Sequence, residues 1–244
     1  MERNWEREVE ARVEFIRGKL AEAHASGIVF GNSGGKDSAL VGILCRRACE
    51  NTVGIIMPCD SKVNFGSDAR DGGEVAEKFG IETRVADLTP LKALMKETVA
   101  GVTEKVTQSA EINFAPRLRM MTLYGVAASE NRLVAGTGNR SERYVGYFTK
   151  WGDGACDFNP IADLTVGEVY AMLEYLGAPE AVIKKAPSAG LFEGQTDEAD
   201  MGVTYAAIDR YILTGEASPE DKAKIDARHS ASAHKLRMPA VFGE

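Results

Sequence analysis

The stretch Gly27–Leu44, GIVFGNSGGKDSALVGIL, constrains the fold of this chain more than any other feature. A short apolar run, typical of a buried strand, leads into a loop of glycine, serine, asparagine, lysine and aspartate, and a helix-like apolar run follows. The start of a helix has unpaired backbone N–H groups and favours an anion, and glycine lets the backbone approach phosphate oxygens closely. The stretch therefore predicts a strand, a phosphate-binding loop and a helix. A plain turn capped by Ser33 or Ser38 remains the alternative.

Strand and helix patterns alternate along the rest of the chain. Expected strands are 28–30, 52–58, 82–87 and a fourth in 132–138 that runs into a glycine loop. Expected helices are 4–25, 38–49, 68–79, 116–129 and 205–213. Two more are expected from their ends: one has Thr89 as its cap, Pro90 at its first position and Gly101 as its end, and the other runs from a Thr165/Glu168 capping box to near Gly177. Short, continuously apolar strands between helices indicate a parallel sheet that is covered on both faces. We expect one α/β domain over residues 1–244, three-layered and Rossmann-like, with its ligand beyond the loops after the first and fourth strands.

Composition narrows the possible partners. The formal net charge is −7 and no dense block of lysine and arginine occurs, so the sequence gives little support for nucleic-acid or membrane binding. No apolar stretch is long enough to span a bilayer, and the charged N-terminus does not resemble a signal peptide. We therefore expect a cytoplasmic protein.

The glycine loop is not a Walker loop. Phe30 stands where the first Walker glycine belongs, and Asp37 follows Lys36 in place of serine or threonine. Asp37 is itself a possible oxygen ligand for Mg²⁺. SGGKDS instead resembles the S-G-G-x-D-S pattern of the ATP pyrophosphatase group. That resemblance implies a loop that holds the β- and γ-phosphates of ATP while the α-phosphorus is attacked and pyrophosphate leaves.

Four further motifs strengthen the resemblance. They are PRLRMMTLY (116–124), GTGNRSERYVGYFTKWGDGACDFNP (136–160), KKAPSAGLFEGQTDE (184–198) and HKLRMP (234–239). Together they strongly resemble the ammonia-dependent NAD synthetases, in order and over almost the whole chain. The resemblance implies an adenine nucleotide alpha hydrolase-like fold and ATP-dependent amidation of deamido-NAD by ammonia, through an acyl-adenylate, with release of AMP and pyrophosphate. Residues 1–27 are too few for the amidase domain of glutamine-dependent relatives, so ammonia is the expected donor.

The resemblance also assigns roles to residues. It implies ATP contacts at Gly31, Asn32, Ser33, Gly34, Gly35, Lys36, Asp37, Ser38, Thr137 and Ser188. It implies deamido-NAD contacts at Arg117, Lys150, Asp157, His234 and Lys235. Asp37 and Glu142 are the expected Mg²⁺ ligands, and no residue is expected to act as a covalent nucleophile or general base. The alternatives are a solvated surface position for Glu142 and Arg117, and a turn role for Asp157.

Some positions depart from the family pattern. Val166 stands where many members have a lysine that contacts ATP, so Lys184 or Lys185 is a candidate substitute. Asn32 replaces a commonly apolar residue, and Pro116 replaces a frequent alanine and is expected to stiffen a helix start. Residues 188–200 have little apolar periodicity and predict a lid, with an ordinary surface loop as the alternative.

Two other functions stay open at this point. The chain could be another adenylating enzyme with the same loop, or a nucleotide-sensing module without chemistry. The paired carboxylates argue against the second, because sensing alone does not require a metal on the phosphates. The resemblance also implies a homodimer, with the apolar 118–128 helix face as a candidate interface, although a core face would show the same pattern.

Overall fold

The centre of the fold is a parallel sheet. The computed structural model describes residues 3–60, 64–185 and 196–243. Over these residues the sheet has four strands, β1 (Gly27–Gly31), β2 (Thr52–Ile56), β3 (Glu82–Val85) and β4 (Arg132–Ala135), in the order β3-β2-β1-β4. All three pairings are parallel, and Val29 of β1 lies opposite residues of both β2 and β4. The predicted parallel sheet is confirmed.

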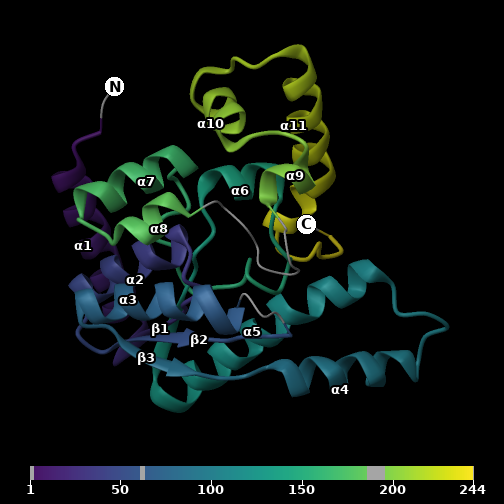
Figure 1. The fold of residues 1–244 in the computed structure, drawn as a ribbon, viewed down its shortest axis with the longest axis horizontal. Helices are drawn as coiled ribbons and strands as arrows, with labels where there is room; N and C mark the ends of the chain where they lie inside the picture. The colour runs from purple at the N-terminus through teal and green to yellow at the C-terminus, as the bar shows by residue number, and fades with distance from the viewer. Residues whose placement is uncertain (1–2, 61–63, 186–195, 244) are drawn as a thin grey trace.

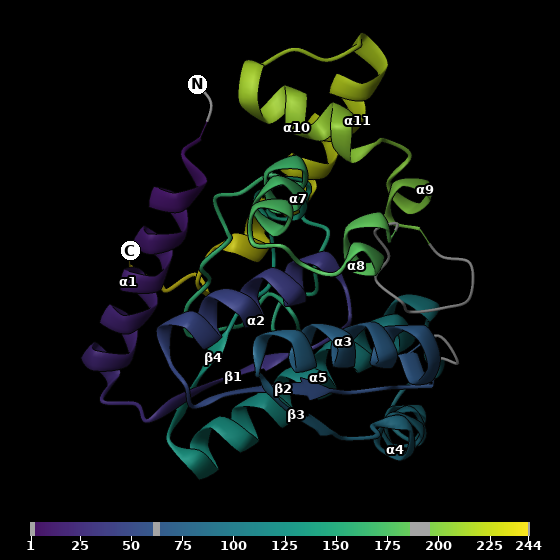
Figure 2. The same cartoon turned by 60° about the vertical axis from the view of Figure 1, so that its left-hand side comes forward.

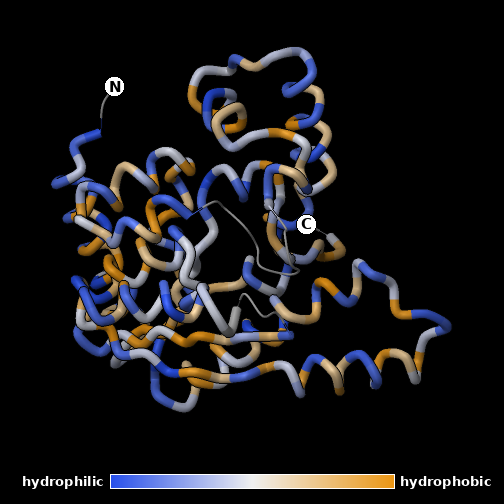
Figure 3. Tube along the Cα trace, in the orientation of Figure 1, coloured by the Kyte–Doolittle hydropathy of each residue, from blue (hydrophilic) through white to orange (hydrophobic). Residues whose placement is uncertain are grey.

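Helices cover both faces of this sheet (Figures 1 and 2). α1 (Trp5–Ala23), α2 (Lys36–Ala48) and α3 (Ala69–Phe79) belong to one side, and α4 (Thr89–Ala100) and α5 (Gln108–Glu130) to the other. Side chains of β1 alternate between two apolar clusters, with Ile28 and Phe30 packed toward α2 and Val29 packed toward α5. Figure 3 shows hydrophobic residues along the strands and more hydrophilic ones on the outer helices. The three-layer α/β prediction is confirmed.

A further group of helices lies above the sheet in Figure 1. It comprises α6 (Arg140–Val145), α7 (Val166–Tyr175), α8 (Glu180–Lys184), α9 (Asp197–Met201), α10 (Tyr205–Thr214), α11 (Pro219–Ser232) and the 3₁₀ helix η2 (Ala233–Leu236). A third apolar cluster holds much of this group together, and Val166 and Ile208 are buried in it. No helix among the described residues is both long enough and apolar enough to cross a membrane.

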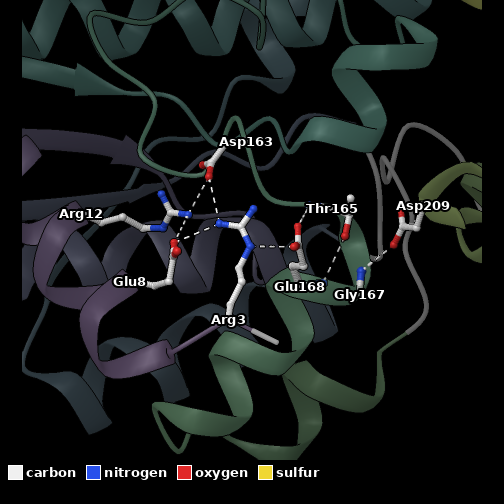
Figure 4. Close-up of polar contacts among 8 residues, drawn as sticks. All are labelled: Arg3, Glu8, Arg12, Asp163, Thr165, Gly167, Glu168 and Asp209. Carbon is white, nitrogen blue, oxygen red and sulfur yellow. Dashed lines mark hydrogen bonds and ion pairs between the residues drawn. The ribbon is translucent and has the colours of Figure 1, made fainter. Parts of the chain in front are cut away.

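A charged network fixes the start of α7 (Figure 4). The predicted capping box is confirmed, because Thr165 accepts from the Glu168 backbone N–H and the Glu168 carboxylate accepts from the Thr165 N–H at 2.8 Å. Arg3 donates to the same Glu168 at 2.7 Å. Asp209 of α10 accepts from the Gly167 N–H at 2.8 Å. The chain before α1 and the α10 helix therefore both hold α7 in place.

Several predicted element boundaries were wrong. The N-cap of α4 is Leu88, because the Asp87 carboxylate accepts the Thr89 N–H and the Thr89 hydroxyl accepts the N–H of Asp60. α5 begins at Gln108 after a Thr107 cap, so the expected start at 116 was two turns late. Pro116 lies inside this helix rather than stiffening its start. The expected strands 52–58 and 82–87 end two residues earlier in the structure, at residues 56 and 85, and β4 ends at residue 135, before the glycines of 136–138.

Candidate phosphate and metal site

The loop between β1 and α2 is held in shape by Asn32. Its side-chain oxygen accepts from the Gly34 N–H at 3.3 Å, and its amide nitrogen donates to the Gly72 carbonyl of α3 at 3.0 Å. Asn32 is buried, so an amide here satisfies two backbone groups that an apolar residue would leave unpaired. Gly34 has φ +71°, and a Cβ at this position would lie 2.1 Å from the Asp68 carbonyl oxygen. This residue must therefore be glycine for two separate reasons.

The N-terminus of α2 faces this loop. The N-cap is Gly35, which has no side chain to accept from the first N–H groups of the helix. The first N–H with a helical partner is that of Ala39, which donates to the Gly35 carbonyl. The Ser33 and Ser38 hydroxyls contact each other at 3.0 Å, and Ser38 donates to the Gly35 carbonyl at 3.0 Å. The N–H groups of Lys36 to Ser38 therefore have no partner within the helix and suit an anion. The predicted helix start at Ser38 was two residues late.

Asp37 and Glu142 meet across the β1–β4 boundary. In the sheet, β2 lies on one side of β1 and β4 lies on the other, so the direction of the strand order reverses between β1 and β4. In open parallel sheets such a reversal leaves a crevice where ligands bind. Asn139, the fully buried N-cap of α6, donates to Asp37 Oδ1 at 3.0 Å. The backbone N–H of Asn139 donates to Glu142 Oε2 at 3.1 Å, and its side-chain oxygen accepts the Glu142 N–H at 3.0 Å. One residue thus connects both predicted metal carboxylates.

The electrostatics of this pair favour a cation. Burial, and next the Asp37 carboxylate, raise the pKa of Glu142 well above its usual range, against the opposing effect of Lys36. Asp197 adds to this effect, and its carboxylate accepts from the buried Tyr205 hydroxyl at 3.0 Å. The described residues contain no cluster of three or more histidine, cysteine or acidic ligands for a metal. Two carboxylates beside a phosphate loop are nevertheless the donor set that Mg²⁺ takes when phosphate oxygens and water complete its shell.

These groups line a cavity of about 870 Å³. The wall includes most of the predicted ATP residues, namely Gly31, Asn32, Ser33, Gly35, Lys36, Asp37, Ser38 and Thr137, and also Glu142 and Lys235. Gly34 is part of the loop but does not line the wall. Ser188 and the first part of the predicted lid, 188–195, lie outside the described residues, and α9 forms most of the remainder.

Val166 does not line the cavity, where the family lysine would be expected. Its side chain is buried in the third apolar cluster, which explains why an apolar residue is accommodated there. Lys185, one of the two candidate substitutes, does line the cavity. Its Nζ contacts the Gly34 carbonyl at 3.3 Å, Asp68 at 2.8 Å and Asp71 at 2.6 Å. Lys184 instead pairs with Glu180 on the exposed side of α8.

The predicted deamido-NAD residues fall into separate places. Lys150 donates to the His234 carbonyl at 2.7 Å, and Lys235 donates to the Gly146 and Phe148 carbonyls at 2.8 Å each. These three therefore gather at one end of the cavity, although only Lys235 lines its wall. Asp157 lies beside β4, where it accepts from the Val134 N–H at 2.7 Å and from the Tyr124 hydroxyl at 3.2 Å.

Arg117 is exposed on α5 and does not line the cavity of a single chain. Two residues further on, Arg119 points into the cavity and donates to the Met57 carbonyl at 3.1 Å. The candidate dimer face of α5 is divided, with Leu118 buried and Met121 63% exposed. One part of the apolar pattern therefore belongs to the core and the other to the surface.

Sequence reasoning missed Asn139 and Tyr205 as parts of the site, and it offered Lys185 only as one of two candidates. A signal existed for Asn139, because Asn139 and Glu142 have the spacing of a capping box, as Thr165 and Glu168 do. No local pattern shows that Lys185 reaches Gly34 or that Tyr205 holds Asp197.

The fold and the site define an α/β protein with a glycine-rich loop suited to a phosphate group beside two carboxylates, at the reversal point of a parallel sheet. The chain belongs to the NAD synthase family, whose model matches residues 8–239. It is 48% identical over 240 residues, 98% of each chain, to the NH₃-dependent NAD⁺ synthetase of Carboxydothermus hydrogenoformans. The family resemblance is thereby confirmed.

Two solved structures are similar over the whole chain. The NMN synthetase of Francisella tularensis aligns with a TM-score of 0.92 and 33% identity, covering 100% of both chains. The NH₃-dependent NAD synthetase of Campylobacter jejuni aligns with a TM-score of 0.77 and 32% identity, covering 99% of this chain and 100% of that chain.

Proposed function

We propose that this protein is an NH₃-dependent NAD⁺ synthetase, which uses ATP to convert deamido-NAD to NAD and releases AMP and pyrophosphate. The observation that carries the proposal is the link from Asp37 through Asn139 to Glu142, beside the N–H groups that begin α2. Family membership and the 48% identical relative with this activity support it. A location in the cytoplasm remains a prediction from the sequence.

The chemistry follows from charge and position. The substrate carboxylate attacks the α-phosphorus of ATP, pyrophosphate leaves, and ammonia then displaces AMP from the acyl-adenylate. A carboxylate is already a nucleophile, so the protein has to position two anions and neutralise the leaving group. We assign the phosphates to the α2 N-terminus and the neighbouring Ser33 and Ser38 hydroxyls.

Mg²⁺ fits the residues present. Asp37 and Glu142 would hold it, because burial and next the charge of Asp37 raise the pKa of Glu142, and a divalent cation would offset both effects. When bound, the ion would supply positive charge to the departing pyrophosphate. Asn139 keeps both carboxylates on the same side of the crevice through its three hydrogen bonds.

We also propose a homodimer that completes the dinucleotide site. Arg117 is exposed and lies outside the cavity of one chain, so a role in binding deamido-NAD requires it to face a second copy. Met121, exposed on the same helix, offers apolar area for that contact. Sedimentation of wild type and Met121→Asp tests this, and a monomeric wild type at micromolar concentration would contradict it.

A second candidate is the amidation of nicotinate mononucleotide to NMN. The higher TM-score to the Francisella tularensis NMN synthetase, 0.92 against 0.77, favours it, whereas the 48% identical relative is an NAD⁺ synthetase. Both reactions amidate the same nicotinate carboxylate. They differ only in whether the adenylate half of a dinucleotide is bound.

A direct assay separates the two. The protein is incubated with ATP, Mg²⁺ and ammonium, and with either deamido-NAD or nicotinate mononucleotide, and kcat/KM is compared for NAD and NMN formation. Higher kcat/KM with deamido-NAD supports the first proposal, and higher kcat/KM with the mononucleotide supports the second. Release of ADP in place of AMP would contradict both. Asp37→Asn should lower kcat at least about 100-fold while the fold is kept, because it removes an anionic ligand of the Mg²⁺ that would neutralise the departing pyrophosphate.

A further inference from the structure

The strongest unexplained feature of the site is a buried lysine at the position that the S-G-G-x-D-S pattern leaves open. Lys36 is only 6% exposed. Its Nζ contacts Asp37 Oδ2 at 2.7 Å, while the other Asp37 oxygen accepts from Asn139. A buried ammonium is rarely kept unless its charge is paired. Here the pairing carboxylate is the one to which we assign the metal.

The surroundings of Lys36 hold its ammonium in place. Its Nζ lies 5.5 Å from the ring centroid of Tyr205 and 6.0 Å from that of Tyr170. Tyr205 is fixed in turn by its hydrogen bond to Asp197, and Tyr170 by a hydrogen bond to the Lys185 carbonyl at 3.1 Å. The rings of Tyr170 and Tyr205 and the ion pair with Asp37 therefore hold the Lys36 ammonium beside the predicted metal ligands.

The charge of Lys36 acts on both carboxylates. Burial opposes the ammonium, but Asp37 and next Glu142 outweigh it and raise the pKa of Lys36. Lys36 in return opposes the rise in the pKa of Glu142. The lysine therefore neutralises part of the charge that a divalent ion would otherwise neutralise.

We propose that Lys36 is an internal counterion of the Asp37–Glu142 pair, which competes with Mg²⁺ until a nucleotide draws the ammonium to its phosphates. This inference rests on the proposed function, because it takes the two carboxylates to be the metal site. It makes Lys36 a positioning residue that couples metal binding to nucleotide binding. Without nucleotide the metal meets a site already neutralised by lysine. With nucleotide the phosphates bind both the lysine and the metal, so the two cations no longer compete.

The experiment measures Mn²⁺ binding by its paramagnetic signal, because Mn²⁺ takes the same oxygen ligands as Mg²⁺. Wild type is compared with Lys36→Met, and with Lys36→Gln in case the first variant does not fold. Each is titrated with Mn²⁺ alone and with Mn²⁺ plus α,β-methylene-ATP. Removing a neighbouring unit charge should tighten binding of Mn²⁺ alone about tenfold or more, by analogy with its effect on proton affinity. With the nucleotide analogue, the gain should disappear or reverse.

Lys185→Met is the matched control. This lysine also lines the cavity, but it pairs with Asp68 and Asp71. Its removal should change the affinity for Mn²⁺ alone by no more than about twofold, because separated charges in an open cavity are screened. An equal gain in both variants would mean a general field effect and would overturn the proposal, as would unchanged affinity in the Lys36 variants.

The two proposals can fail separately. Asp37→Asn tests the metal site, because it should remove the extra Mn²⁺ affinity that the protein adds to the bound nucleotide analogue. If it does not, both the metal assignment and the counterion role of Lys36 are wrong. If Asp37→Asn behaves as expected and Lys36→Met binds Mn²⁺ alone like wild type, only the counterion role is wrong. If Lys36→Met binds Mn²⁺ alone more tightly and the Lys36→Met/Asp37→Asn double variant keeps that higher affinity, the metal binds elsewhere. That result would also overturn the counterion role of Lys36.

Discussion

Replacing Gly34 by alanine should damage both the fold and the phosphate site. The backbone at Gly34 has φ +71°, a conformation that costs an alanine about 1–2 kcal/mol. The added Cβ would also lie 2.1 Å from the Asp68 carbonyl oxygen and 2.9 Å from its carbon. An ordinary carbon–oxygen contact is about 3.3 Å or longer, so the backbone of the loop or of η1 (Asn64–Asp68) has to move.

The expected loss can be separated into these two parts. Overpacking a rigid site costs about 1–3 kcal/mol, so Gly34→Ala should lose about 2–5 kcal/mol of unfolding free energy in total. Gly177→Ala is the matched control, because Gly177 has φ +68° and a Cβ added there would meet no atom within 4 Å. That variant should lose only the backbone part, about 1–2 kcal/mol.

Urea unfolding followed by circular dichroism measures both losses, and calorimetry measures ATP binding. Gly34→Ala should also weaken ATP binding, because movement of the loop disturbs the Asn32 contact to the Gly34 N–H and the cap at Gly35. Gly177→Ala should bind ATP like wild type. Equal losses of stability in the two variants, or normal ATP binding by Gly34→Ala, would refute the reasoning.

Two further predictions concern side chains that hold the site and its support. Asn139→Ala should lose about 1–2 kcal/mol of unfolding free energy, because α6 loses its N-cap, and it should also lose most activity, because the donor to Asp37 is removed. Thr165→Ala is the control, because it removes a comparable cap from α7 and should keep a normal kcat. Similar activity in the two variants would contradict a role for Asn139. Burial opposes ionisation of Asp163, but the hydrogen bond and charge of Arg12 outweigh it and lower the pKa of Asp163. The ion pair therefore stabilises the fold above about pH 4, and this stabilisation is lost as pH falls through the lowered pKa. Asp163→Asn should therefore melt below wild type at neutral pH and approach it in acid, and a gap in melting temperature that stays constant with pH would contradict this.

The fold was predictable where its pattern is local. β1 and β2 are mostly apolar and are buried along nearly their whole length because both faces of the sheet are covered, and such runs are easily recognised. The early turns of α5 were missed because Pro116 interrupts the pattern and was interpreted as a helix start. α11 was missed because its apolar pattern is weak, although the Ser218 cap and the following Pro219 were a usable signal.

The site was predictable only in part, and for a related reason. The loop from Gly31 to Ser38 is continuous in sequence, so its composition indicates its purpose. Asn139 acts on Asp37 from 102 positions away, and Lys185 acts on Gly34 from 151 positions away. Neither contact leaves a local pattern. Arg117 and Arg119 carry the same charge two residues apart, and only the packing of α5 decides which one points into the cavity.

The adjacency of β1 and β4 has a consequence for the newly made polypeptide. β1 and its loop leave the ribosome early, and β2 can pair with β1, and β3 with β2, before the segment from Arg132 to Glu142 has been synthesised. Until that later strand docks, one flank of the first strand is an open edge, and the crevice lacks Glu142, one of its two predicted metal carboxylates. Substrate affinity can therefore arise only after the last strand is inserted, and a nascent chain stalled before that point should be unable to retain ATP.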